Sequence, residues 1–241
     1  MNSGDHQVLR FVAMYRVATR SSIANLFGER TDPDKPVSRL VKEKLLRPHK
    51  GLPGNRTVYQ LTKKGAATVG VSPARGRLAG AQSMLKNLGV LLFCQVEGAV
   101  RHRVDAEQLS NVLGARLKDA AYCLAHVKGR TIVFECYVPG TETPVLTVVR
   151  HLRKLLRDAR RQPALVEAIK DLRYGFAVIV QNQSRRKAIM DAVRRKGEDE
   201  RLPLVKRVRV WVEAAEELGH YLGTAAPCLG SVRDGSSAET L

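Results

Sequence analysis

Residues 35–65 read KPVSRLVKEKLLRPHKGLPGNRTVYQLTKKG, which is the pattern of a helix, a strand, a tight turn, a second strand and a further helix start. The helix is predicted over 35–46, where apolar side chains recur at the spacing of one helical face: Val37, Leu40, Val41 and Leu45. The Pro-Gly-Asn triplet at 53–55 predicts the turn, and 58–61 the returning strand. A basic helix followed by a basic hairpin indicates a winged helix-turn-helix, whose helix fits the major groove of DNA.

The polar residues of this stretch are the candidate DNA contacts. On the predicted helix they lie opposite the apolar stripe or just after it: Lys35, Ser38, Arg39, Lys42 and Lys44. In the predicted hairpin they lie around the turn: His49, Lys50, Asn55 and Arg56. Arg39 and Lys42 are three residues apart and lie away from the apolar stripe, so we expect both to face DNA, where an arginine can read a base edge. Lys50 and Arg56 suit phosphates, which fix register without carrying sequence.

The neighbouring residues supply the remaining elements of such a domain. A first amphipathic helix is predicted near the N-terminus, and the Thr19 hydroxyl can cap a second helix. Asp32 and Pro33 open the third helix, and Thr62 opens the closing one. The order of helix, helix, helix, hairpin and helix predicts an α+β N-terminal winged helix-turn-helix domain over residues 1–75.

The charge of the chain agrees with a nucleic-acid partner. The 241 residues carry a formal net charge of +18, with a pI of about 10.2. A field of this sign attracts polyanions and gives salt-dependent affinity before any base is read. Double-stranded DNA is therefore the expected partner.

Other classes of protein do not fit the composition. No apolar run approaches the ~20 residues of a membrane-spanning helix, and MNSGDHQ at the start lacks the pattern of a signal peptide. The cysteines show neither CxxC pairing nor a disulfide framework: Cys94, Cys123, Cys136 and Cys228. We expect a cytoplasmic protein, associated with nucleoid or plasmid DNA, without a membrane partner, a cofactor or a metal site.

Residues 76–97 are predicted to be a linker and a connecting helix. Glycine and other small residues mark the linker, and the helix is expected over 81–95. Winged-helix regulators often occupy two-fold DNA sites in pairs, so we expect a homodimer. One apolar stripe of the helix can form the dimer seam or pack between two domains: Met84, Leu85, Leu88, Leu91 and Leu92.

The pattern changes near residue 98, and residues 98–223 are predicted to form an α/β domain with a mixed sheet. Its predicted helices are 105–113, 145–162 and 184–196, and its predicted strands are 119–127, 131–138, 174–180 and 205–212. The strand YGFAVIV at 174–180 is almost wholly apolar, as expected for a central strand covered on both faces. Ser184 is expected to cap its helix. Residues 224–241 are expected to form a flexible tail.

Two predicted helices of this domain carry clusters of positive charge. A solvated face usually mixes both signs, whereas only Asp158 opposes the cluster on the first of these helices. Two interpretations stay open: a face that keeps the protein soluble, and a second nucleic-acid surface. The residues of this candidate surface are Arg150, Arg153, Lys154, Arg157, Arg160, Arg161, Arg185, Arg186 and Lys187.

The chain resembles the replication-relaxation family of plasmid and mobile-element proteins. The matching segments are RLVKEKLL at 39–46, GNRTVYQLTKKG at 54–65, Asp119-Ala120, Phe134-Glu135 and Gly140-Thr141-Glu142. The resemblance extends over about residues 7–215. It implies sequence-specific binding of double-stranded DNA in a plasmid or integrative element, as a transcription regulator or as a replication or transfer accessory factor.

The second domain is also similar in element order to the restriction-endonuclease-like fold. Those nucleases hold a magnesium ion with an Asp on one strand and a Glu on the next, followed two residues later by a lysine. The similarity implies Asp119 and Glu135 as the carboxylates, but Tyr137 occupies the lysine position. A two-residue turn at 128–129 would also place the two carboxylates on opposite faces of the sheet. We therefore expect DNA binding without cleavage; the alternative is a metal-dependent nuclease or nicking accessory targeted by the winged helix.

Overall fold

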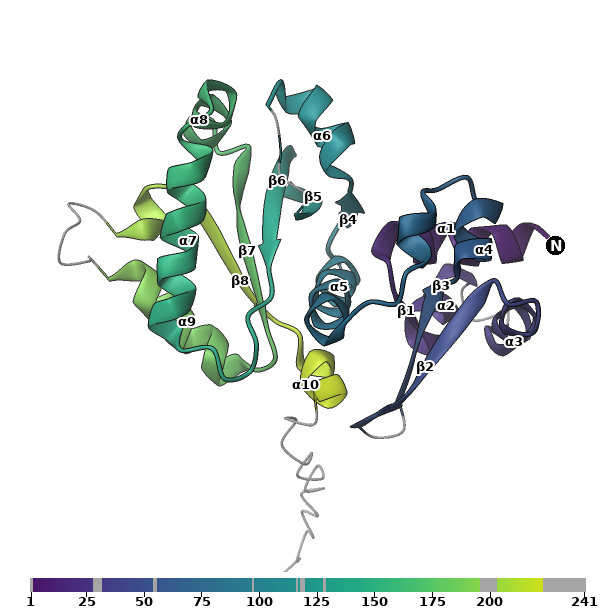
Figure 1. Ribbon diagram of the computed structural model, residues 1–241. Coiled ribbons are helices and arrows are strands. Elements are labelled where there is room, and N and C mark those ends of the chain that lie inside the picture. Colours follow the sequence, from purple (N-terminus) through teal and green to yellow (C-terminus); the bar gives the residue numbers. More distant parts are fainter. Residues whose placement is uncertain are drawn as a thin grey trace, which may run out of the picture.

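The computed structural model describes residues 2–27, 32–53, 56–96, 98–115, 117, 120–127, 129–195 and 203–222. Over these residues the chain is an α+β fold with ten α-helices and two β-sheets, one of them mixed. The two sheets stand on either side of one central helix (Figure 1). The predictions for Asn55, Asp119, the last residue of the helix expected over 184–196 and the tail at 224–241 fall outside the described residues.

The N-terminal unit has its four helices and its hairpin in the order that the sequence predicts for residues 1–75, with one unpredicted two-residue strand, β1, between the first two helices. A three-stranded antiparallel sheet, in the order β1-β3-β2, packs with four helices around an apolar core that includes Leu9, Ile23 and Leu40. The elements are α1 (Ser3–Tyr15), β1 (Ala18–Thr19), α2 (Arg20–Phe27), α3 (Asp34–Lys42), β2 (Leu46–Leu52), β3 (Arg56–Leu61) and α4 (Lys63–Thr68).

Local chemistry explains where these elements begin and end. The Thr19 hydroxyl accepts a hydrogen bond from the Ser22 amide at 3.0 Å, which confirms the predicted cap of α2. The helix predicted over 35–46 is shorter than expected: it ends at Lys42, and Lys44 adopts a left-handed backbone (φ 59°) before β2 begins. Gly65 is required in α4, because a Cβ there would lie 2.1 Å from the Leu45 carbonyl oxygen.

A 3-10 turn (Pro73–Gly76) and α5 (Ala81–Cys94) connect the two units. Residues on several sides of α5 are buried, because it lies between the second sheet and the N-terminal unit. The apolar stripe predicted as a possible dimer seam is packed inside the chain, with Met84, Leu88, Leu91 and Leu92 all buried. The alternative reading of this stripe, packing between two domains, is therefore confirmed, and the stripe is not available as a seam.

The second sheet has the strand order β4-β5-β6-β7-β8. Strands β4 to β6 are antiparallel neighbours and β6 to β8 are parallel, so the sheet is mixed as predicted. Every residue of β7 is buried, as its apolar sequence indicates. The strands are β4 (Arg101–Val104), β5 (Ala121–Val127), β6 (Arg130–Tyr137), β7 (Tyr174–Val180) and β8 (Arg209–Ala214).

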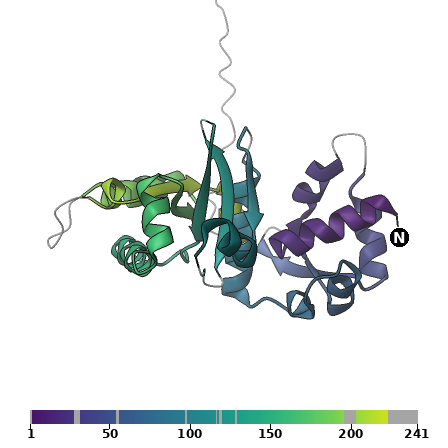
Figure 2. The same cartoon turned by 90° about the horizontal axis from the view of Figure 1, so that it is seen from above.

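Helices cover both faces of this sheet. The first face carries α7, α8 and α9, and the opposite face carries α5 and α10 (Figures 1 and 2). The helices are α6 (Ala106–Leu113), α7 (Val145–Ala159), α8 (Pro163–Lys170), α9 (Gln183–Arg194) and α10 (Glu216–Leu222). None of the helices in the described part of the chain combines the length and apolar character needed to cross a membrane.

Several elements of the second half differ from the sequence prediction. The cap of α9 is Asn182 rather than Ser184, since its side-chain oxygen accepts a hydrogen bond from the Arg185 amide at 2.8 Å. Strand β8 begins at Arg209 instead of 205, because a short 3-10 turn (Leu204–Lys206) precedes it. Strand β4 and helices α8 and α10 were not predicted; each is eight residues or shorter, too short for a clear periodic signal.

Buried polar ties hold the two units together. The Arg103 guanidinium on β4 donates to the Tyr15 carbonyl oxygen at 2.7 Å and to the Asn87 side-chain oxygen at 2.9 Å, thereby joining β4, α1 and α5. Arg75 donates to the Ala13 carbonyl oxygen at 2.9 Å and pairs with Asp105. These bonds, together with the apolar cluster around α5, set the position of α3 relative to the second sheet.

Candidate nucleic-acid interface

The outer face of α3 is an exposed basic surface of the N-terminal unit. Val37 and Leu40 are buried against the core, whereas Lys35, Ser38 and Lys42 are exposed. The exposed three are separated by three and four residues, so they form one stripe along the helix. Within the described part of the chain, neither Lys35 nor Lys42 has an ion-pair partner. Helix α3 lies at the outer edge of the molecule (Figure 1).

Arg39 has a different role from the one its position predicts. Its Nε donates to Asp5 Oδ2 at 3.0 Å, and its Nη2 donates to Asp5 Oδ1, so the guanidinium grips the carboxylate with two nitrogens. Asp5 is 0% exposed, while the Arg39 side chain is 42% exposed. Arg39 therefore ties α3 to α1, and the structure gives no support to its reading a base edge.

The Asp5 carboxylate is stabilised from two sides. Burial by itself raises the pKa of Asp5, but the hydrogen bonds from Arg39 and from the Asn2 amide, at 3.0 Å, bring the pKa below its ordinary value. Asn2 and Asp5 also form a capping box at the start of α1. The N-terminus of α1 and the middle of α3 are thus locked together.

A second ion pair fixes the start of α3. Arg20 on α2 donates through Nε to Asp34 Oδ1 at 2.7 Å, and both side chains are largely exposed. The Asp34 amide in turn donates to Asp32 Oδ1 at 3.0 Å. Two arginines from different helices therefore set the direction of α3, which leaves its lysines to face solvent.

Of the two cations that the sequence assigns to phosphates in the β2–β3 hairpin, Lys50 is free in the described chain and Arg56 is bound. Lys50 is exposed, and His49 is half-buried opposite Val58. The Arg56 guanidinium lies 5.2 Å from the centre of the Tyr221 ring, on α10. Arg56 thus connects the hairpin to the C-terminal helix, whereas Lys50 has the exposure expected of a phosphate contact.

Sequence reasoning missed a further anchoring arginine, Arg47. This half-buried side chain on β2 donates to the Gly76 carbonyl oxygen at 2.9 Å and so joins the hairpin to the turn before α5. Lys44, predicted as a contact on the helix, lies instead in the exposed turn between α3 and β2. The KEKLLR run alone does not show which of its cations turns inward.

Helix α7 presents the second basic surface. Its exposed cations Arg150, Lys154 and Arg157 are spaced by four and three residues, so they line one face of the helix, and exposed Arg161 follows in the turn after the helix ends at Ala159. Arg161 lies 3.8 Å from Asp158; in the described residues the other three have no ion-pair partner. Arg153 is half-buried, and Arg160 borders a separate cavity of about 730 Å³ beside α8 and β8.

The cations of α9 that were assigned to this surface divide into two groups. Arg185 donates to the carbonyl oxygens of Gly140, Thr141 and Thr143, which holds the loop before α7 in place. Arg186 donates to the Val212 carbonyl oxygen at 2.9 Å. Lys187 is exposed. Of these three, Lys187 alone has no hydrogen-bond or ion-pair partner in the described chain, and its contact with nucleic acid stays a prediction.

The environment of Glu135 bears on the nuclease alternative. Glu135 lies opposite Tyr122 in the sheet, which is the predicted register, and accepts a hydrogen bond from the Tyr174 hydroxyl at 2.7 Å. Burial and this carboxylate raise the pKa of Tyr174. Glu135 lines a cavity of only about 30 Å³, together with Asp158.

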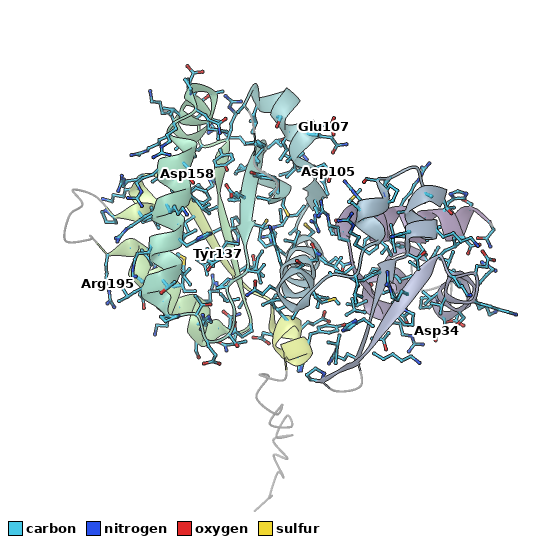
Figure 3. All side chains as sticks on the ribbon, in the orientation of Figure 1. Asp34, Asp105, Glu107, Tyr137, Asp158 and Arg195 are labelled. Atoms are coloured by element: carbon cyan, nitrogen blue, oxygen red, sulfur yellow. The ribbon has the colours of Figure 1, made fainter. Side chains whose placement is uncertain are left out.

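Tyr137, at the position of the nuclease lysine, stacks on His151 with 4.2 Å between the ring centres. Figure 3 shows Tyr137 beside α7. In the residues that the structure describes, His, Cys, Asp and Glu do not form any group of three that could hold a metal ion.

No protein-family model, curated protein or solved structure matches this chain. The resemblance to the replication-relaxation family rests on the sequence motifs alone.

Proposed function

We propose that the protein binds double-stranded DNA through α3 and the β2–β3 hairpin. The observation that carries the proposal is the exposed stripe of Lys35, Ser38 and Lys42, whose two lysines have no ion-pair partner in the described chain. An α-helix with its side chains is about 10–12 Å across, and the major groove is about 12 Å wide. The stripe would then meet base edges and flanking phosphates.

The arrangement around α3 supports this role. Helices α1 to α4 and the small antiparallel sheet have the order of a winged helix-turn-helix, with α3 in the place of the recognition helix. Exposed Lys50 on the hairpin would hold the phosphate backbone next to it. The net charge of +18 would steer the chain toward DNA.

We further propose a regulatory or replication and transfer accessory role in a plasmid or integrative element, from the family resemblance. One module of this size reads a short sequence, and a homodimer on a two-fold site would extend it. Such a dimer would have to use a surface other than the buried stripe of α5.

Charge reversal on α3 tests the proposal. We expect Lys35→Glu/Lys42→Glu to weaken binding to duplex DNA by more than about tenfold and to lower the salt slope by about two, because two phosphate-range cations are lost. The matched control is Arg10→Glu/Arg130→Glu, two exposed cations on α1 and β6 with the same change of charge. Equal loss in both variants would mean that net charge, and not α3, sets the affinity.

A further inference from the structure

The basic stripe of α7 is an exposed surface that the proposed function does not use. Arg150, Lys154 and Arg157 span about 10 Å of helix, at 1.5 Å per residue, and Arg161 extends the row into the turn after α7. One strand of a duplex carries a charge every 3.4 Å of axis, so the helical part of the stripe alone faces about three phosphates. Three of the four cations have no ion pair within the described residues. The stripe is long enough and free enough to follow a phosphate backbone.

The opposite face of α7 limits what the stripe can bind. Val148, Val149, Leu152 and Leu156 are buried against the second sheet. An amphipathic helix binds a membrane by inserting its apolar face between lipids, which α7 cannot do while that face forms the core. Its exposed side offers cations and one exposed leucine, Leu146, at its first turn. This chemistry fits a polyanion such as nucleic acid.

The two basic surfaces face away from each other. From α7 the molecule runs through the second sheet, α5 and α1 to α3, and each packed layer adds about 10 Å, or roughly 40 Å in total. Figure 1 shows α7 and α3 on opposite sides of the molecule, and Figure 2 shows the same separation from above. Figure 3 places Asp34, at the start of α3, and Arg195, just after α9, at opposite ends. One straight duplex cannot reach both surfaces.

We propose that α7 is a second duplex-binding surface, and that a single copy of the chain bridges two DNA segments, one on α3 and one on α7. The bridging rests on the proposed function for the first duplex. The second contact is to phosphates, so it is sequence-tolerant and depends strongly on salt. Duplexes of any sequence can therefore occupy α7 while α3 holds its own site.

The experiment measures capture of a second duplex. One short duplex is fixed to beads, the full chain is added, and a labelled duplex of unrelated sequence is supplied; the number of duplexes bound per chain is measured in solution. We expect Lys154→Glu/Arg157→Glu to reduce capture by at least about tenfold and to lower the stoichiometry from two duplexes to one, with the tighter site unchanged. The control Arg10→Glu/Arg130→Glu, with the same change of charge, should keep both the capture of the second duplex and the stoichiometry of two duplexes per chain. Circular dichroism and urea unfolding confirm that each variant folds.

The other outcomes separate the two proposals. If Lys154→Glu/Arg157→Glu still captures the second duplex, two copies of the chain must hold one duplex each, and bridging by a single copy is wrong. This outcome does not affect the proposed role of α3. If the α7 reversal removes all duplex binding and the α3 reversal removes none, the proposed function fails and bridging fails with it. Tighter α7-dependent binding of RNA, or of vesicles rich in phosphatidylserine, overturns the assignment to a second DNA segment.

Discussion

Helices α3 and α7 have the same sequence pattern but use their arginines differently. Each has an apolar face toward a core and a basic face toward solvent. On α3 the one arginine, Arg39, is bound to a buried carboxylate, so lysines alone are left free. On α7 Arg150 and Arg157 stay unpaired in the described chain. The comparison teaches that amphipathic spacing identifies the solvent face of a helix, but not which cations on it are available to a ligand.

The bound arginines share a physical reason. A guanidinium presents five donors in a rigid fork, so it can hold a carboxylate or several carbonyl oxygens at once, which a lysine cannot do. Arg39 binds a carboxylate on α1, Arg103 binds groups on α1 and α5, and Arg185 binds three carbonyl oxygens of the loop before α7. They stabilise the arrangement that leaves the remaining cations exposed.

Arg103 is the most buried of these arginines, so replacing it should have the largest effect on the free energy of unfolding. Arg103→Ala leaves the Asn87 side-chain oxygen and the Tyr15 carbonyl oxygen without their donor inside the interface between the two units. We expect the free energy of unfolding to fall by about 2–4 kcal/mol. Urea denaturation followed by circular dichroism measures it. Arg10→Ala, at an exposed position, serves as the control, with an expected change within about 0.5 kcal/mol. A loss for Arg103→Ala no greater than that of the control would show that the buried arginine is not a structural tie.

The sequence predicted helices and strands well where the periodicity was long. The helix predicted over 145–162 appears as α7, which ends at Ala159, and the strand predicted over 174–180 appears as β7, because one carries a regular apolar stripe and the other is apolar throughout. Lys35, Lys42 and Lys50 are exposed as predicted. The roles of Arg39, Arg56 and Arg185 could not be read from spacing, since their partners lie 34 or more residues away in the chain or come from α10.

The partner of Arg39 gives a prediction that depends on pH. Asp5→Asn removes the buried negative charge, and we expect it to lower the free energy of unfolding by about 2 kcal/mol at pH 7, as for hydrogen bonds to a charged group. The pKa of Asp5 in the folded chain lies below its ordinary value of 3.8. The ionised carboxylate therefore stabilises the fold above that value, and this contribution is lost as the pH falls through the folded pKa.

The difference between wild type and Asp5→Asn should thus be constant near neutral pH and shrink in acid, below a pH of about 4. Urea unfolding at a series of pH values measures the two curves. A difference that stays the same down to the acid transition would mean that Asp5 is not held ionised by Arg39.

On α3, replacing the free cation Lys42 should change DNA affinity, whereas replacing the bound cation Arg39 should change the stability of the fold. Lys42→Ala should weaken duplex binding by about threefold to tenfold and lower the salt slope by about one, with no change in unfolding. Arg39→Lys keeps the charge but loses the two-nitrogen grip on Asp5, so it should lower the urea midpoint and leave the salt slope unchanged. If Arg39→Lys instead changes the salt slope and leaves the urea midpoint unchanged, Arg39 belongs to the DNA-facing surface and the contrast with α7 is wrong.

The β2–β3 hairpin also has a free cation, Lys50, and a bound one, Arg56, and we expect the smallest effects on DNA binding here. Lys50 is exposed near the turn, so Lys50→Ala should weaken binding to every duplex by a similar few-fold factor and lower the salt slope by about 0.9. The Arg56 guanidinium lies over the Tyr221 ring, so Arg56→Ala should change the salt slope less. Titration of both variants at several salt concentrations, with two unrelated duplexes, compares the slopes. A slope change for Arg56→Ala equal to that of Lys50→Ala would show that Arg56 leaves Tyr221 for a phosphate when DNA binds. The hairpin would then be released from α10 on binding, and its two cations would act alike.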